Sequence, residues 1–214
     1  RLAAKADIAV ENFRPGVMDR LGLGYDHLRR VNPRLVYGAI RGFGDERTGK
    51  SPYGDWPAYD IVAQAMGGII GITSTEIGGM PTKIGPGVGD IVPAMQAAFG
   101  LVAALVRARA TGEGQFVDVA MVDGILALCE RIVFQHGTDG TVPGPEGNSH
   151  PLFCPYGLFP AKDGAVAIGC PTDDFWRLLA RQIGLAGMAD DPGLSTSPHR
   201  VARRTEVEGA GSAW

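Results

Sequence analysis

The feature that most constrains the fold is a strand–helix–strand pattern at the start of the chain. Residues 7–13 form an apolar run with a polar end, which is typical of a buried parallel strand. An amphipathic stretch from Val17 to Val31 follows, is interrupted by two glycines, and ends at Asn32-Pro33. Residues 34–40 have the composition of a second strand. This spacing predicts a βαβ unit, and therefore an α/β fold built on a parallel sheet.

The middle of the chain alternates between glycine-rich loops and apolar helices. Long loops in compact domains are often functional, and residues 42–57 form one here. The strongest helical pattern runs from Ile91 to Ala110 and ends at Thr111-Gly112. The other predicted segments are a small-residue helix at 58–72, a Gly/Pro-rich segment at 73–89, a strand at 115–119 and a helix at 121–135.

A change in composition at residues 137–149 predicts a linker. Beyond it, short strands flank an Ala-Lys-Asp-Gly turn at 161–164, where Asp-Gly favours a hairpin, and a helix follows at 175–183. After Asp190 the chain is polar and interrupted by prolines. We therefore expect an incomplete large domain at 1–137, a linker at 138–150 and a truncated small α+β domain at 151–214. Both ends look cut, so we expect a piece of a longer protein.

Composition excludes several classes of function. The net charge is −3 with no basic stripe, which argues against a nucleic-acid partner. Cys129, Cys154 and Cys170 are scattered and form no CxxC pair, so we expect buried thiols and neither a metal site nor a disulfide. No apolar stretch is expected to be long enough to span a membrane. We predict a cytoplasmic protein.

Asp90 is the candidate nucleophile. It ends the sequence Ile-Gly-Pro-Gly-Val-Gly-Asp, directly before the strong helix, so it could simply be a helix N-cap. The neighbouring glycines leave space for a substrate, and Pro93, expected near the third helical position, removes one backbone N–H that a cap would use. The helix N-terminus favours the charged form of a carboxylate. These glycines have the wrong spacing for a dinucleotide or P-loop motif, as does Gly42-Phe43-Gly44.

Other candidate residues occupy loops at the ends of predicted elements. Arg14 and Arg20 lie where the first strand ends, the place where α/β folds bind ligands, and they could bind phosphate or simply be solvated. Tyr59-Asp60 begins a helix, where the expected roles are packing by Tyr59 and capping by Asp60. Asn148, His150 and Tyr156 share a loop, in which His150 is expected to be exposed.

Four segments taken together resemble the class III CoA-transferases, the CaiB/BaiF family, which includes formyl-CoA transferase, carnitine CoA-transferase and α-methylacyl-CoA racemase. Their order and spacing carry the resemblance, which covers the chain to about residue 205. They are ADIAVENFRPGVMDRLGLGYDHLRRVNPRLVYGAIRGFG, PAYDIVAQAMGG, the glycine-rich loop ending in GD, and AALVRARATGEGQFVDVAMVDG.

The resemblance implies a Rossmann-like large domain, a small α+β domain and an interlaced homodimer. It implies that Asp90 attacks the thioester of an acyl-CoA, which is a substrate and not a permanently bound cofactor, and that a small carboxylic acid accepts CoA. Three residues correspond to a segment lining the adenosine end of CoA: Asn12, Phe13 and Arg14. Arg20 corresponds to an arginine of the same pocket, and Tyr59 to a tyrosine near the pantetheine or nucleotide portion.

The sequence also departs from parts of the family. Racemases have a histidine where Tyr59 stands here, which argues against proton transfer at Cα. Pro57 replaces a basic residue of formyl-CoA transferases, and the run of glycines that covers their active site is missing. We therefore expect larger acids than formate or oxalate. An acyl-CoA epimerase, or a truncated chain that only binds CoA or dimerises, remain the alternatives.

Overall fold

The computed structural model describes residues 1–212 and divides them into two compact units. The first unit contains residues 1–73 and 81–143, and the second contains residues 74–80 and 144 onward. The division between 143 and 144 falls inside the expected linker. Residues 74–80 join the second unit through a bridge between Ile77 and Glu146, although the predicted limits assign them to the first domain. The limits of the predicted domains stay a prediction.

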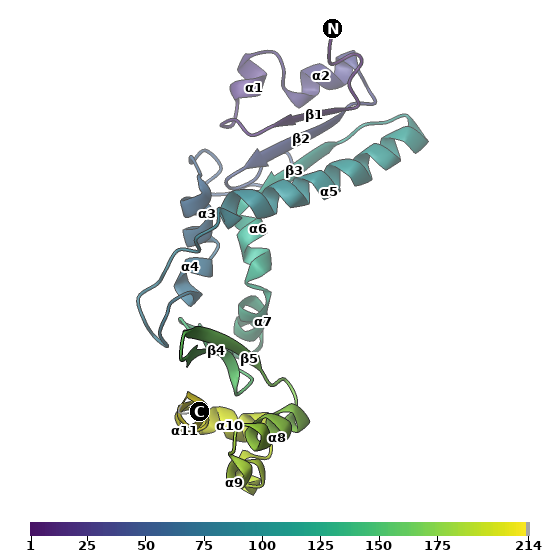
Figure 1. The fold of residues 1–214 in the computed structure, drawn as a ribbon. Helices are drawn as coiled ribbons and strands as arrows, with labels where there is room; N and C mark the ends of the chain where they lie inside the picture. Colours follow the sequence, from purple (N-terminus) through teal and green to yellow (C-terminus); the bar gives the residue numbers. More distant parts are fainter. Residues whose placement is uncertain (213–214) are drawn as a thin grey trace. The chain divides into compact units, whose positions relative to one another are not determined.

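The first unit contains the expected parallel sheet, in the order β1-β2-β3 (Figure 1). Its strands are β1 (Ile8–Glu11), β2 (Val36–Arg41) and β3 (Phe116–Ala120). The predicted helix between the first two strands forms as two pieces, α1 (Val17–Arg20) and α2 (Tyr25–Val31). Gly22, with a φ of 70°, makes the break, because residues with a side chain rarely adopt this conformation.

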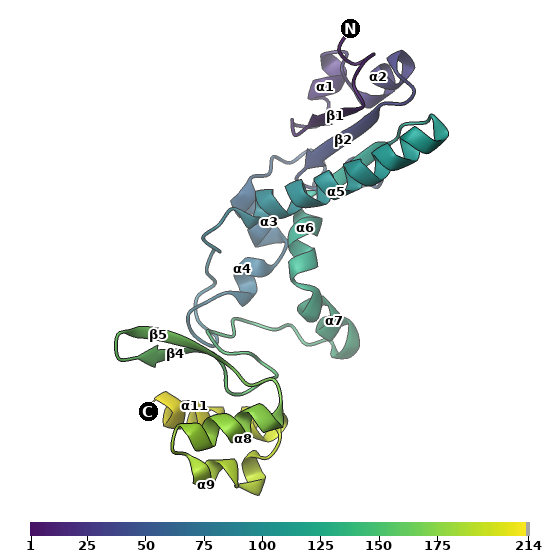
Figure 2. The same cartoon turned by 45° about the vertical axis from the view of Figure 1, so that its right-hand side comes forward.

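Alternate residues of β2 face opposite layers, as the strand period of two requires. Tyr37 and Ala39 pack with Leu28 of α2 on one face. On the other face Val36 packs with Leu101 of α5 (Val88–Thr111), which runs along the sheet in both Figure 1 and Figure 2. Burial on both faces explains why β2 reads as a nearly continuous apolar run.

The expectation that no segment is long enough to span a membrane was wrong. By length and composition alone, α5 is long and apolar enough to cross a membrane, and 28% of its apolar window is buried within the protein. Three of its residues, Leu101, Ala104 and Ala108, pack against the sheet, as in a core helix. A stripe of its apolar side chains, including Phe99 and Val106, stays exposed.

The remaining helices of the first unit lie beyond one end of α5, where α3 and α6 contact it (Figure 1). They are α3 (Asp60–Met66), α4 (Ile69–Ile72), α6 (Met121–Leu128) and α7 (Glu130–Asp139). Their core contains Ala63, Ile69 and Ile125. Residues 42–57 form the predicted long loop without regular structure.

The second unit is a β-hairpin with short helices. The predicted hairpin is confirmed as β4 (Tyr156–Ala161) and β5 (Gly164–Gly169). The helical elements are α8 (Asp173–Gln182), α9 (Ala186–Ala189), a 3₁₀ turn at Pro192–Leu194, α10 (Ser197–Ala202) and α11 (Arg204–Ser212). Pro192 and Pro198 begin helices here and do not interrupt them, because the first turn needs no N–H donor. The three cysteines are free and buried, as expected.

Candidate active site

A cavity of about 360 Å³ in the first unit collects most of the predicted site residues. Asn12, Phe13 and Arg14 reach it from the loop after β1, Tyr59 from the start of α3, and Asp90 from the first turn of α5. The carboxyl ends of parallel strands meet at one edge of a sheet, which is why the loop after β1 and the end of β2 reach the same place. The rest of the lining consists of Pro15, Ile40, Arg41, Gly42, Gly54, Trp56, Pro57, Ala58, Pro93, Ala94 and Met121.

Arg20 does not line this cavity. It is the last residue of α1 and is exposed, and a Cβ built on Gly16 would lie 3.1 Å from its Nη1 atom. The structure therefore does not bring Arg14 and Arg20 together around this cavity. Helix α1 has only four residues, so sequence spacing alone could not fix the direction of Arg20.

Asp90 is not the N-cap of α5. The helix begins at Val88 with Gly87 as its N-cap, three residues earlier than predicted, so Asp90 is the third helical residue and Pro93 the sixth. The backbone N–H of Gly89 donates instead to Oδ1 of Asp60, at 2.8 Å. Among the described residues no hydrogen bond or ion pair reaches the carboxylate of Asp90, and its side chain is exposed to the cavity. An unpaired carboxylate in the first turn of a helix is a suitable nucleophile.

The cap of α5 is therefore supplied from another helix. Asp60 was expected to cap its own helix, but α3 has no side-chain cap, and Asp60 caps α5 across 29 residues of sequence. Gly89 permits this approach, because a Cβ there would lie 2.6 Å from the carbonyl oxygen of Asp60. The expectation that Tyr59 packs was also wrong: it is 69% exposed and lines the cavity.

A buried ion network holds the loop that carries Asn12, Phe13 and Arg14. Oε2 of Glu11 accepts a hydrogen bond from the backbone N–H of Phe13, at 2.8 Å, and Oε1 pairs with Nη2 of Arg41, at 2.9 Å. Arg41 also pairs with Asp45. Neither Glu11 nor Arg41 was predicted from the sequence to take part in such a network. The available signal was a charged residue at the end of each of two apolar strands, Glu11 on β1 and Arg41 on β2.

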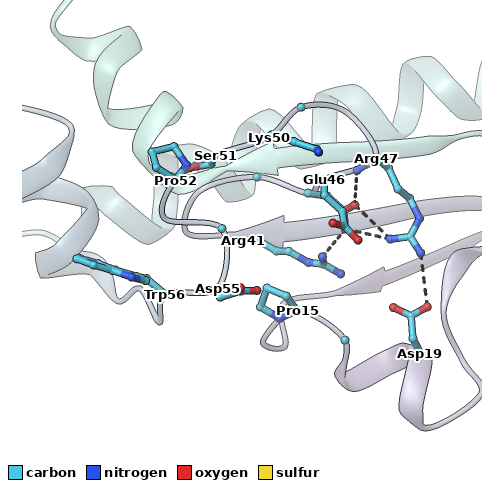
Figure 3. A pocket seen from close by; sticks show the side chains of 15 residues that line it. Pro15, Asp19, Arg41, Glu46, Arg47, Lys50, Ser51, Pro52, Asp55 and Trp56 are labelled. Carbon is cyan, nitrogen blue, oxygen red and sulfur yellow. Dashed lines mark hydrogen bonds and ion pairs between the residues drawn. The ribbon is translucent and has the colours of Figure 1, made fainter.

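A second cavity, of about 510 Å³, lies against the long loop of residues 42–57 (Figure 3). It shares Pro15, Arg41, Gly54 and Trp56 with the first cavity. Arg47 extends across its wall and forms ion pairs with three aspartates, Asp19, Asp26 and Asp45.

The charge of Arg47 in that wall is stabilised by its neighbours. Burial lowers the pKa of its guanidinium, but the hydrogen bonds and charges of the aspartates outweigh this effect and raise the pKa above its ordinary value. Arg47 therefore stays protonated, and the aspartates balance its charge.

The loop residues Asn148, His150 and Tyr156 belong to the second unit and line a shallow cavity there. His150 is half-buried, not exposed as expected. Its ring packs against Phe153 and Tyr156, with centroid distances of 4.7 and 5.1 Å. Its Nδ1 accepts a hydrogen bond from the backbone N–H of Leu152. These contacts give His150 a structural role in its loop.

Comparison with known proteins finds CoA-transferase relatives that match along the whole chain. The model of CoA-transferase family III matches residues 1–214. The succinyl-CoA:mesaconate CoA-transferase of Haloarcula hispanica is 43% identical over 213 residues, which are 100% of this chain and 53% of that protein. The acetyl-CoA:oxalate CoA-transferase of Acetobacter aceti is 37% identical over 210 residues, covering 98% of this chain and 53% of that protein.

Solved structures agree with the fold. A CAIB/BAIF family protein from Brucella suis matches with a TM-score of 0.81 and 33% identity. The match covers 100% of this chain and 56% of that protein's chain. The Rv3272 protein of Mycobacterium tuberculosis has a TM-score of 0.85 and 28% identity, with 100% and 55% covered. The chain thus spans about half the length of the relatives it matches. It belongs to CoA-transferase family III.

Proposed function

We propose that this chain carries the acyl-accepting carboxylate and part of the CoA site of a CoA-transferase, with Asp90 as the nucleophile. The observation that carries the proposal is the position of Asp90, whose unpaired carboxylate shares a cavity with Asn12, Phe13 and Arg14. The exposed rings of Phe13, Trp56 and Tyr59 offer apolar surface in the same cavity. Apolar walls with a few placed polar groups are typical of small-molecule sites.

The chemistry proceeds in four balanced steps. One Asp90 oxygen attacks the thioester carbonyl of the donor, the C–S bond breaks, and a mixed anhydride and CoA thiolate result. The thiolate then attacks the Asp90 carbonyl, which forms an aspartyl thioester and releases the donor acid. The acceptor carboxylate attacks this thioester and forms a second anhydride, releasing the thiolate again. The thiolate finally attacks the acceptor's carbonyl, so acyl-CoA leaves and the Asp90 carboxylate is restored. The thioester energy is conserved only if water is excluded.

The proposed substrates are acyl-CoA esters of small carboxylic acids. Relatives named for succinyl-CoA, mesaconate, acetyl-CoA and oxalate support this class. The expectation of acids larger than formate or oxalate stays a prediction. No histidine is among the described residues that line the cavity, which favours acyl transfer over an epimerase that needs a second proton carrier. The interlaced dimer and the cytoplasmic location stay predictions.

The test is to trap the covalent intermediate. The protein is incubated with succinyl-CoA, acetyl-CoA and a wider panel, quenched with hydroxylamine, digested, and searched by mass spectrometry for a modified peptide containing Asp90. Asp90→Asn should abolish both the adduct and acyl transfer. Asp123→Asn is the matched control, because Asp123 is also the third residue of its helix and is exposed, but lies outside the cavity.

Each alternative predicts a different result. Deuterium entering Cα of the acyl group without an Asp90 adduct would support an epimerase. Neither signal from a folded protein that still binds CoA would support a non-catalytic CoA-binding chain. Loss of activity in Asp123→Asn equal to that in Asp90→Asn would remove the special role given to Asp90.

A further inference from the structure

The loop that leads to Asp90 cannot fix its own conformation. It contains Gly85, Gly87 and Gly89, and glycine loses more backbone freedom on ordering than any other residue. Its backbone hydrogen bonds lie at its end, where the N–H of Val88 donates to the carbonyl of Pro86 and the N–H groups of Asp90 and Ile91 donate to the carbonyl of Gly87. The start of the loop therefore depends on side chains outside it.

The buried amide of Gln64 is the principal external anchor. Its side chain is fully buried, and its Oε1 accepts a hydrogen bond from the backbone N–H of Ile84, at 3.0 Å. Its Nε2 faces the carbonyl oxygens of Ile84 and Pro86, each at 3.4 Å. The same Nε2 donates to both carboxylate oxygens of Asp60, at 2.9 and 3.0 Å. One side chain thus contacts the start of the loop and the residue that caps α5.

Asp60 extends this anchor to the other end of the loop. Its Oδ1 accepts a hydrogen bond from the N–H of Gly89, the residue immediately before Asp90. Nζ of Lys83 lies 3.8 Å from Oδ2 of Asp60 and balances its charge. Gln64 and Asp60 therefore hold the loop at residues 84 and 89. Because Asp60 accepts from the N–H of Gly89, that N–H does not need the carboxylate of Asp90, which is left available to a substrate.

We infer that Gln64 is a positioning residue for Asp90, acting through the 84–89 loop and the Asp60 cap. The inference rests on the proposed function of Asp90. An amide is required at position 64 because it must accept from Ile84 and donate to Asp60 at the same time. A carboxylate at position 64 would face Asp60 as a like charge, and an aliphatic side chain would leave the Ile84 N–H unpaired.

The test compares Gln64→Leu with the wild type and with Leu101→Ala, a core variant of α5 away from the loop. The rate of Asp90 adduct formation and kcat should fall ~10–100-fold in Gln64→Leu, because misplacing a reacting group by about 1 Å can cost this much. KM for acyl-CoA should change less than about threefold, since the segment of residues 12–14 is untouched. Leu101→Ala should lose thermal stability while keeping kcat near the wild-type value.

Gln64→Glu supplies a readout that general destabilisation does not. Among the described residues, Asp60 is the charged group in contact with position 64, and Lys83 lies beside Asp60. When the introduced carboxyl group is ionised it repels Asp60, and when it takes up a proton it can donate to Asp60 as the amide does. The activity of this variant, relative to wild type, should therefore recover as the pH is lowered, whereas Gln64→Leu should show no such recovery.

The outcomes separate the two proposals. No Asp90 adduct in the wild type would overturn both the nucleophile and its positioning residue. A normal adduct in the wild type with an unchanged rate in Gln64→Leu would overturn the positioning role alone. The same conclusion would follow if Leu101→Ala lost kcat to the same degree, if Gln64→Leu raised KM with kcat unchanged, or if the pH profile of Gln64→Glu matched that of wild type.

Discussion

Replacing Arg41 by methionine should destabilise the first unit strongly. The substitution keeps much of the apolar volume but removes the cation from between two buried carboxylates. The side chains involved are 8% exposed for Arg41, 1% for Glu11 and 0% for Asp45. At an effective dielectric constant of about 20, charges separated by the 2.9 Å between Arg41 Nη2 and Glu11 Oε1 attract by about 6 kcal/mol.

The net cost should be smaller than this attraction but still large. Asp45 keeps its ion pair with Arg47, at 3.2 Å, whereas among the described residues Glu11 keeps only the backbone N–H of Phe13. Removing one partner of a buried pair typically costs about 3–5 kcal/mol, because the other charge stays buried. For a chain of this size the unfolding midpoint should fall by about 6–20 °C. Acyl-CoA affinity should fall as well, because Glu11 and Arg41 support the loop carrying Phe13.

Thermal unfolding followed by circular dichroism measures the effect. The control is Arg107→Met, the same substitution at an exposed pair of the same unit, where Arg107 and Glu113 are 3.7 Å apart and 49% and 74% exposed. It should cost less than about 1 kcal/mol. The double variant Glu11→Gln with Arg41→Met should recover part of the loss, because it removes the charge left behind. The reasoning is refuted if Arg41→Met and Arg107→Met lower the midpoint equally.

Three further predictions concern the cavity, a thiol and a half-buried ion pair. A Cβ on Gly87 would lie 4.0 Å from Oδ2 of Asp90, which is ordinary van der Waals contact and no clash. The added methyl group should crowd the space beside this carboxylate, so Gly87→Ala should slow acyl transfer ~10-fold at unchanged thermal stability. A Cβ on Gly85 would have no atom within 4 Å, so Gly85→Ala should leave kcat unchanged. If both variants reacted at equal rates, crowding of Asp90 would be excluded as the cause of slower acyl transfer. Burial raises the pKa of Cys154 to about 11, so iodoacetamide should not modify this thiol in the folded protein at pH 8. Rapid labelling of Cys154 in the native protein would contradict this expectation. The hydrogen bond from Arg203 lowers the pKa of Asp191 below 3.8, so its stabilisation is present above that pH and is lost as the pH falls through the lower folded value. Asp191→Asn should therefore weaken the acid dependence of the unfolding midpoint, and an unchanged pH profile would count against the pair.

Local pattern predicted the elements and the edge of the sheet at which the site forms. The apolar runs that became β1 and β2, and the strong helix that became α5, were each found within a few residues of their observed bounds. Because ligand sites in parallel α/β folds lie at the carboxyl ends of strands, the segment after the first strand was expected to bind a ligand. The structure places Asn12–Arg14 in one cavity with Asp90.

The errors arose where a distant partner decides. Asp60 was expected to cap its own helix, and an N-cap was the alternative role for Asp90, because each has the right residue type next to a helix start. Whether either does so depends on Gly89, which lets α3 approach α5 closely enough for Asp60 to cap it. Arg20 illustrates the same limit, since its direction depends on how the short helix α1 is oriented.

The sequence by itself determined the α/β class, the family and a set of candidate site residues, because period, composition and motif order are local properties. Only the tertiary structure decided which of those residues are free to react. Glu11 pairs with Arg41 across 30 residues, and Asp60 caps α5 across 29. Buried charges and amides must find partners wherever the fold places them, and no local pattern encodes that choice.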